Sequence, residues 1–200
     1  GLQFVIHTIA QKSREGGEDF YVAKLDLTKA YDRVLRSKML KRMLAAKCPP
    51  HELCAYWRGL RRKLRFSFLG MLPDGMLKLR GLPQGDPLSP AVSAFLTDGF
   101  WSDATVLTDV PGCGVLMDGS TVLGVAWADD FYLFARSKWA LARMVTFAAA
   151  RFERNLGLSL QTDKTQVFVM TQRVPPAFIT LQGQQVRVHG REVGLTVLGA

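Results

Sequence analysis

Two adjacent acids, Asp129 and Asp130, interrupt one of the most hydrophobic stretches of the chain, residues 121–134. Two like charges side by side cost free energy unless a positive charge lies next to them. Carboxylate oxygens are hard ligands that suit Mg²⁺ or Mn²⁺. A third acid, Asp26, follows another hydrophobic segment 103 residues earlier. The three acids are therefore candidates for one divalent-metal site, provided that the fold brings them together.

A site of this kind has a defined chemistry. Two divalent ions about 4 Å apart bind both the attacking and the leaving oxygen of an in-line phosphoryl transfer. Taken one at a time, the acids have simpler explanations. Asp129 and Asp130 fit a solvated turn, because acids favour turns, and Asp26 fits an acid at the N-terminus of a helix. The other segments of the chain decide between these interpretations.

The elements that must position the acids can be predicted from periodicity. Valine, leucine and aromatic residues on both sides of the acid pair indicate two strands with the acids at the turn between them. Residues 20–27 alternate as a strand that ends near Asp26. Its two faces are expected to carry Tyr21, Ala23, Leu25 and Leu27 on one side, and Val22, Lys24 and Asp26 on the other.

Helices and further strands complete the expected fold. One helix over 39–44 ends before Pro49-Pro50, and a second carries Leu53, Trp57 and Leu60. Two more helices are expected, one with Ser89 as N-cap and Pro90 as first helical residue that runs to about Leu107, and one from Ser137 to Gly157. A hairpin over 64–79, a turn at Asp118-Gly119, and strands around 158–160, 165–170, 178–188 and 193–198 are also expected. This mixture predicts an α+β sheet with helices on one face.

Composition restricts the class of protein. Two hundred residues fit one domain, and the formal net charge of +9 favours a polyanionic partner. No apolar run is long enough to span a bilayer, and no signal peptide is apparent. The cysteines Cys48, Cys54 and Cys113 lack metal-ligand spacing, so we expect reduced thiols and an intracellular, reducing location in nucleus or cytoplasm. Because the chain begins with Gly1, we expect an excerpt of a longer protein.

Taken together, five segments resemble the reverse transcriptase family, in the family's order. LDLTKAYD (25–32) looks like motif A, GLPQGDPLSP (81–90) resembles motif B, and WADD (127–130) resembles motif C, with Trp127 in place of the usual Tyr or Phe. LGLSLQTDKT (156–165) is similar to motif D, and VLG (197–199) to the start of motif E. The wording of motif B is most similar to the non-LTR (LINE-type) retrotransposon branch.

The resemblance implies a polymerase palm, with an antiparallel sheet backed by helices, partial fingers and no thumb. Residues 1–200 would form one domain fragment, with finger and palm elements in about 1–25 and 48–80 and the palm with motifs A to E in 26–47 and 81–200. The implied activity is RNA-directed DNA polymerisation, which adds deoxynucleotides to a primer 3′-OH during retrotransposition. The implied cofactor is a pair of Mg²⁺ ions, with Mn²⁺ as a substitute.

The resemblance also assigns roles to residues. Asp26 and Asp129 would be the principal metal ligands, Asp130 would support them, and the Leu27 carbonyl would complete a coordination shell. Tyr31 would lie beneath the sugar of the incoming nucleotide and exclude a 2′-hydroxyl. The remaining nucleotide-binding residues would be Gln84, Gly85 and Lys164, the last of which would also donate a proton to the pyrophosphate. Candidate contacts to template or primer phosphates are Lys24, Lys29 and the basic run 58–65.

The implied partners are an RNA template, a DNA or RNA primer, dNTPs and the finger and thumb segments of the same protein, with no membrane. We expect little or no polymerisation from this chain alone. Three alternatives stay open: a group II intron-type reverse transcriptase or maturase, another palm enzyme such as an RNA-dependent RNA polymerase or nucleotide cyclase, and a catalytically inert palm retained as a nucleic-acid-binding module. Tyr31 and motif B argue against the second, and the survival of all three acids argues against the third.

Overall fold

The computed structural model describes residues 2–17, 19–27, 30–61, 63–64, 76–77, 80–82, 87–127, 130–170 and 175–189. For residues 2, 3, 13, 14, 30, 31, 63, 64, 76, 77 and 127 it describes the backbone only. The helices are α1 (Leu2–Glu15), α2 (Ala30–Arg33), α3 (Arg36–Ala45), α4 (Pro50–Leu60), α5 (Leu88–Ala104), the 3₁₀ helix η1 (Thr105–Leu107) and α6 (Lys138–Leu156). The strands are β1 (Phe20–Leu25), β2 (Lys63–Leu64), β3 (Met76–Leu77), β4 (Val115–Met117), β5 (Ser120–Val122), β6 (Gly124–Trp127), β7 (Asp130–Ala135), β8 (Gln166–Met170), β9 (Phe178–Leu181) and β10 (Gln184–His189).

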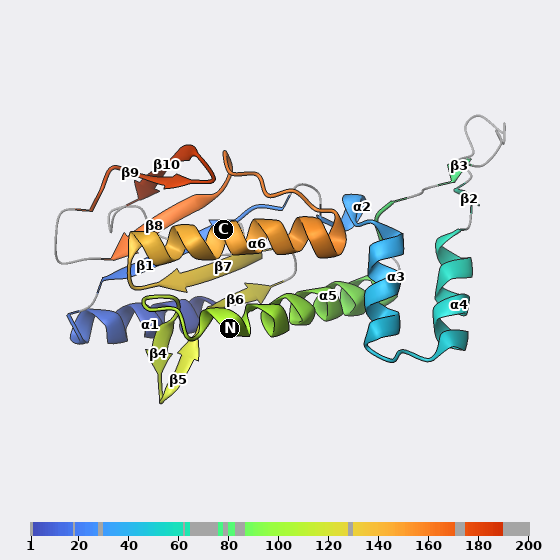
Figure 1. Ribbon diagram of the computed structural model, residues 1–200, viewed down its shortest axis with the longest axis horizontal. Coiled ribbons are helices and arrows are strands. Elements are labelled where there is room, and N and C mark those ends of the chain that lie inside the picture. The colour runs from blue at the N-terminus through green and yellow to red at the C-terminus, as the bar shows by residue number, and fades with distance from the viewer. Residues whose placement is uncertain are drawn as a thin grey trace.

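The central element is a six-stranded sheet with the order β6-β7-β1-β8-β10-β9 (Figure 1). Within it β1 pairs antiparallel with both β7 and β8, and only the contact between β8 and β10 is parallel among the described strands. The predicted α+β class is confirmed. The sheet places β1, which leads to Asp26, directly beside β7, which begins at Asp130.

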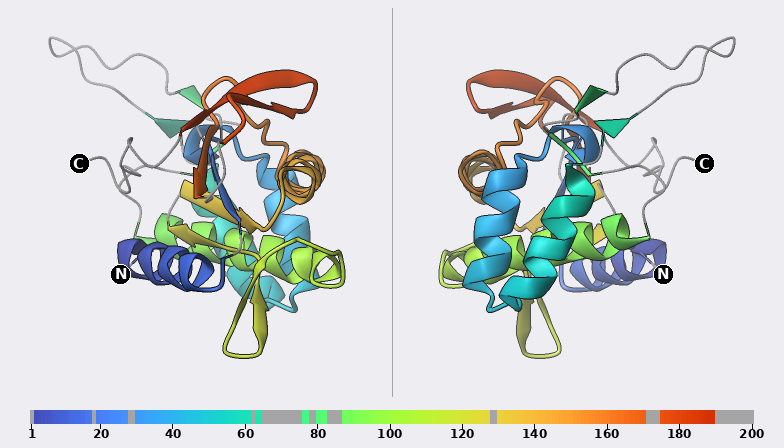
Figure 2. Two further views of the ribbon diagram at one scale, coloured as in Figure 1. Left: turned by 90° about the vertical axis from the view of Figure 1, so that its left-hand side faces the viewer. Right: turned by 90° about the vertical axis from the view of Figure 1, so that its right-hand side faces the viewer.

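The two faces of the sheet bury different helices. On one face α5 and α6 pack against a large core that includes Leu25 and Phe131. On the other face α1 packs against a smaller cluster around Phe20, Val22 and Phe134. Figure 2 shows α1 and α6 on opposite sides of the strands. The expectation that helices would cover one face only is therefore wrong, because the apolar side chains of α1 bury the second face at the beginning of β1.

Helix α6 begins and ends as its capping residues predict. The Ala140 backbone N–H donates to the Ser137 Oγ at 3.2 Å, which satisfies a donor in the first turn. At the other end Gly157 has φ 67°, and the Leu35 side chain lies so close that a Cβ atom at this position would be 2.3 Å from Leu35 Cδ1. Gly157 is therefore required both for its left-handed backbone and for the close approach of the segment before α3.

Other predicted elements start at a different residue or are split into two elements. Helix α5 begins at Leu88 with Pro87 as N-cap, so Ser89 is a buried residue of the first turn rather than the cap. Pro90 is tolerated there because N–H groups in the first turn have no intrahelical partner. The expected strand before the acid pair divides into β5, which pairs with β4 around the Asp118-Gly119 turn, and β6, which joins the main sheet. The expected strand 178–188 is the hairpin β9–β10, and helix α1 was not predicted.

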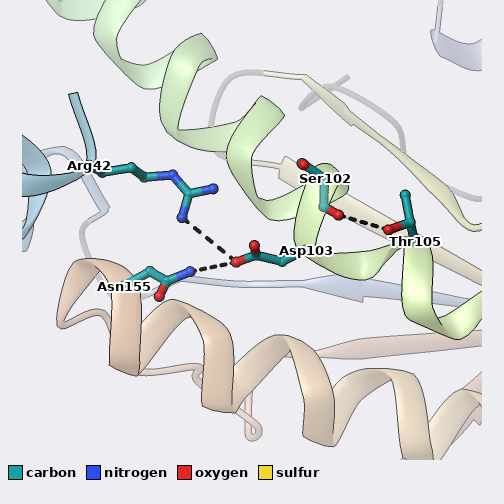
Figure 3. Close-up of polar contacts among 5 residues, drawn as sticks. All are labelled: Arg42, Ser102, Asp103, Thr105 and Asn155. Atoms are coloured by element: carbon teal, nitrogen blue, oxygen red, sulfur yellow. Dashed lines mark hydrogen bonds and ion pairs between the residues drawn. The ribbon is translucent and has the colours of Figure 1, made fainter. Parts of the chain in front are cut away.

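A polar junction joins the helices α3, α5 and α6 (Figure 3). Asp103 of α5 accepts a hydrogen bond from the Asn155 side chain of α6 at 2.7 Å and lies 3.7 Å from the Arg42 guanidinium of α3. Gly99 of α5 makes room for that guanidinium, since a Cβ there would lie 1.8 Å from Arg42 Nη2. The junction fixes α3 against α5 and α6.

The structure also tests the expectations about membrane-spanning segments and cysteines. Within the described residues, no helix combines the length and apolar character needed to cross a membrane. All three cysteines are free thiols, as expected, and Cys113 is buried in the larger core. Burial raises the pKa of the Cys113 thiol, although the charge of Arg143 opposes the shift.

Candidate functional site

Asp26 and Asp130 share one face of the sheet on neighbouring strands. The β1–β7 register pairs Lys24 with Tyr132 and Leu25 with Phe131, so its next step brings Asp26 opposite Asp130. Residues opposite each other in an antiparallel pair lie on the same face. This is the face that α1 covers further along β1, and Asp26 and Asp130 lie beyond that cluster. The predicted alternation of 20–27 is therefore confirmed, and two of the three predicted acids lie at adjoining strand ends, Asp26 just after β1 and Asp130 at the start of β7.

Lys24 compensates the charge of Asp130. Its Nζ lies 3.1 Å from Asp130 Oδ1 and 5.7 Å from the centre of the Tyr132 ring. Burial lowers the pKa of Lys24, but the hydrogen bond to Asp130 and its charge, with a contribution from Tyr132, outweigh burial and raise the pKa above its ordinary value. Burial, together with the charge of Asp130, raises the pKa of the Tyr132 phenol, and Lys24 opposes that shift. Lys24 thus supplies part of the positive charge that the acids require.

Replacing Lys24 with Met should destabilise the chain by about 1 kcal/mol at pH 8 in EDTA, as expected for a partly buried ion pair. The folded-state pKa of Lys24 is raised above 10.5. The contribution of the ion pair to the free energy of unfolding is therefore fully present below pH 10.5 and is lost as pH rises through the raised pKa. Urea unfolding between pH 8 and pH 11 measures this. The matched control is Lys12→Met, which removes the more exposed Lys12–Asp118 pair and should have a smaller effect. A Lys24→Met effect that grows above pH 10.5 would contradict the assignment.

The turn of motif D is joined to Asp26 through the backbone. The Gln161 N–H donates to the Asp26 carbonyl at 2.9 Å, beside an isolated bridge between Leu27 and Leu160. Within the turn, the N–H groups of Lys164 and Thr165 donate to the Gln161 carbonyl at 3.1 Å and 3.0 Å. The acceptor of this hydrogen bond is the Asp26 carbonyl. The Leu27 carbonyl, which the resemblance implies as a metal ligand, is therefore not used by it. These contacts place motif D directly beside motif A.

A pocket of about 670 Å³ opens beside Asp26. Its walls come from the end of β1, the motif D turn with the start of β8, and β10. The charged and titratable side chains that line it are Asp26, Asp163, Lys164, Arg187 and His189, with Thr162 and Gln166 beside them. Pockets of roughly 300–1,000 Å³ are typical of small-molecule sites. Asp26 and Lys164, predicted from separate motifs, therefore share one polar cavity.

Several predicted site residues lie outside the described residues. Asp129, Gln84 and Gly85 are among them, as are motif E and the tip of the 64–79 hairpin, whose ends pair as β2 and β3. The backbone of Tyr31 lies in α2, whereas its side chain and that of Trp127 are not described. In the described part of the chain no three His, Cys, Asp or Glu side chains form a metal cluster. The predicted ligand set depends on Asp129, and the two oxygen donors that are described, Asp26 and Asp130, suit Mg²⁺ or Mn²⁺.

Two residues of the pocket were missed by motif reasoning. Arg187 and His189 belong to β10, where Val186 and Val188 are buried in the larger core. A signal was present, because polar and apolar residues alternate along β10, and this alternation places Arg187 and His189 on the face opposite the core. The alternation did not indicate that β10 pairs with β8, and this pairing is what places β10 beside the pocket.

Comparisons with known proteins agree with the motif assignment. A protein-family model described as "Reverse transcriptase (RNA-dependent DNA polymerase)" matches residues 3–197. The R2 Pol polyprotein of the type-1 retrotransposable element from Nasonia vitripennis is 25% identical over 169 residues, which are 83% of this chain and 16% of that protein. The type-2 element R2DM polyprotein from Drosophila melanogaster is 26% identical over 165 residues, 80% of this chain and 15% of that protein. The chain thus spans about a sixth of the length of these relatives.

Solved structures with a similar fold include two telomerases. Telomerase from Candida tropicalis in complex with a TWJ fragment of telomeric RNA has a TM-score of 0.59 at 13% identity, and covers 92% of this chain and 31% of its own. Telomerase from Candida albicans, also in complex with a TWJ fragment of telomeric RNA, has a TM-score of 0.52 at 17% identity, and covers 92% of this chain and 32% of its own. At this identity the similarity concerns the fold.

Proposed function

Because this chain belongs to the reverse transcriptase (RNA-dependent DNA polymerase) family, we propose that it forms the catalytic palm of an RNA-directed DNA polymerase that acts in retrotransposition. The family resemblance predicted from the five motifs is confirmed, and the two R2 relatives agree with its non-LTR branch. The activity, the substrates and the partners belong to the whole protein and are proposed here for it.

The observation that supports the proposal most strongly is the position of Asp26. It lies one residue beyond the β1–β7 register, which when extended places it opposite Asp130, and its side chain lines the same pocket as Lys164. Three motifs that are distant in sequence thus supply chemically complementary groups to one location. A nucleoside triphosphate suits these groups, because its α-phosphate would approach metal held by the carboxylates and its terminal phosphates would lie near the Lys164 cation.

We assign the roles of the residues as follows. Asp26 and Asp129 would hold the metal ions, with Asp130 kept in place by Lys24. Two bound Mg²⁺ ions would supply activation of the primer 3′-OH and neutralisation of the leaving pyrophosphate. Gln84 and Gly85 would position the nucleotide against the template. Lys164 would donate a proton to the pyrophosphate oxygen as the bond to the α-phosphate breaks.

Primer extension by the full-length protein tests this function. We expect extension of a primed RNA template with dNTPs and Mg²⁺, loss of extension in EDTA, and recovery when Mg²⁺ or Mn²⁺ is added. Extension with rNTPs but not dNTPs would contradict DNA synthesis and favour an RNA polymerase. Binding of primed RNA without extension under any metal condition would favour an inert binding module.

Tyr31 should determine the choice of sugar. In related palm enzymes that make RNA, a small acidic residue occupies the corresponding position, so an aromatic ring there favours deoxynucleotides. The Tyr31→Val variant should reduce the preference for dNTPs over rNTPs by about tenfold or more, the scale of steric discrimination in a binding pocket. Ratios of kcat/KM for a dNTP and the matching rNTP measure it, with Tyr31→Phe as the control that keeps the ring. An unchanged ratio in Tyr31→Val would exclude this role.

A further inference from the structure

The pocket beside Asp26 is assembled by contacts among three segments. The Asp26 carbonyl accepts from the Gln161 N–H, which joins β1 to the motif D turn. The Thr162 hydroxyl of that turn donates to the Gln182 side chain at 3.1 Å, which joins the turn to the β9–β10 hairpin. Thr162 is 7% exposed. These contacts hold the hairpin as a wall of the pocket rather than as a separate surface loop.

The hairpin wall carries positive charge toward the pocket. Arg187 lies on the face of β10 opposite the buried Val186 and Val188, which is the face of the sheet that carries Asp26. His189 lies two residues further along the same face, with its ring 5.4 Å from the Phe168 ring. Within the part of the chain that the structure describes, neither Arg187 nor Lys164 forms an ion pair with a carboxylate. Both cations therefore remain available to an anion in the pocket, although the carboxylates Asp26 and Asp163 line it as well.

We propose that Arg187 is a second phosphate-binding residue of this pocket, acting with Lys164 on the β- and γ-phosphates of the incoming nucleotide and on the pyrophosphate product. The inference rests on the proposed function of the same site. A planar guanidinium suits phosphate because two of its N–H groups can donate to two oxygens at once. A volume of about 670 Å³ with Asp26 at one wall suits a nucleoside triphosphate, and contact with the primer or template backbone is the alternative that the primer–template Kd tests.

The test uses the full-length protein with Arg187→Gln, and Arg187→Lys as the conservative variant. We expect the KM for dNTP and the Ki for inorganic pyrophosphate to rise about tenfold in Arg187→Gln, as for loss of one charge-assisted hydrogen bond. The Kd for primer–template should not change, and Arg187→Lys should recover part of the effect. The matched control is Arg154→Gln, an exposed residue of α6 on the opposite face of the sheet, which should behave as wild type.

The outcomes separate the two proposals. Unchanged KM and Ki in Arg187→Gln would overturn the phosphate role while polymerisation persists. A weaker primer–template Kd with unchanged KM would also overturn it and would assign Arg187 to the nucleic-acid backbone. Calorimetric titration of inorganic pyrophosphate with Mg²⁺ tests the pocket without turnover. Binding that depends on Arg187 in a protein that extends no primer would contradict the proposed function and support the pocket, and binding that does not depend on Arg187 would overturn the pocket role.

Discussion

The Asp26→Asn variant of the full-length protein should lose about 10³-fold in kcat, the upper range for removing one preorganised electrostatic contact to the transition state. Asn keeps the shape of Asp but lacks the charge that binds a divalent ion. Asp26 directly follows β1, which pairs on both sides, and its carbonyl accepts from the Gln161 N–H, so the backbone should keep its position. Single-nucleotide extension of a primed RNA template with saturating dNTP measures the effect.

A matched substitution separates the effect on kcat of losing the charge at Asp26 from the effect of changing the net charge of the protein. Asp109→Asn changes an exposed acid remote from the pocket and should leave kcat within about twofold, as is usual for surface positions. The fold of Asp26→Asn is checked by the temperature midpoint of unfolding, which should match wild type or exceed it. Retention of full activity in Asp26→Asn would remove the basis of the metal site.

The largest effect on stability should come from Arg36. This arginine is 5% exposed, and its guanidinium donates to the carbonyls of Gly81 at 2.8 Å and Leu60 at 2.5 Å. It thereby joins the start of α3, the end of α4 and the beginning of motif B. Arg36→Met keeps an aliphatic stem but leaves these carbonyls without the donor, which should cost about 3 kcal/mol. Urea unfolding followed by circular dichroism measures the free energy of unfolding.

Lys41→Met is the control for Arg36, because it makes a similar change at an exposed position of the same helix. It should alter the free energy of unfolding by no more than about 0.5 kcal/mol. If Arg36→Met were no more destabilising than Lys41→Met, the three segments would be held by apolar packing around Met39 and Leu60 instead.

Local patterns predicted those parts of the fold whose causes are local. The alternation of 20–27 placed Asp26 on the correct face, and the capping chemistry of Ser137 and Gly157 defined α6. The assignment of Ser89 as a cap was wrong because Pro87 and Leu88 already begin the helix. Capping preference alone does not distinguish a cap from a residue in the first turn.

The features that escaped prediction depend on contacts between distant segments. Arg36 stands in a stretch with Arg33 and Lys38 that has the appearance of a solvated face, and its partners are backbone carbonyls 24 and 45 residues away. Arg187 is an exposed residue of a short strand, and its relevance depends on the parallel contact between β10 and β8. Motif reasoning identified Asp26 and Lys164 because the family pattern already encodes such contacts.

The proposed chemistry requires that Asp26 and Asp129 bind the same pair of divalent ions. Its most direct test is anomalous diffraction from crystals of the full-length protein with Mn²⁺, a primer–template that lacks the 3′-OH, and the next dNTP. We expect Mn²⁺ peaks about 2 Å from carboxylate oxygens of Asp26 and Asp129, with the two carboxylates about 4–6 Å apart. Mn²⁺ bound without Asp26, or the two carboxylates on opposite faces of the sheet, would contradict it.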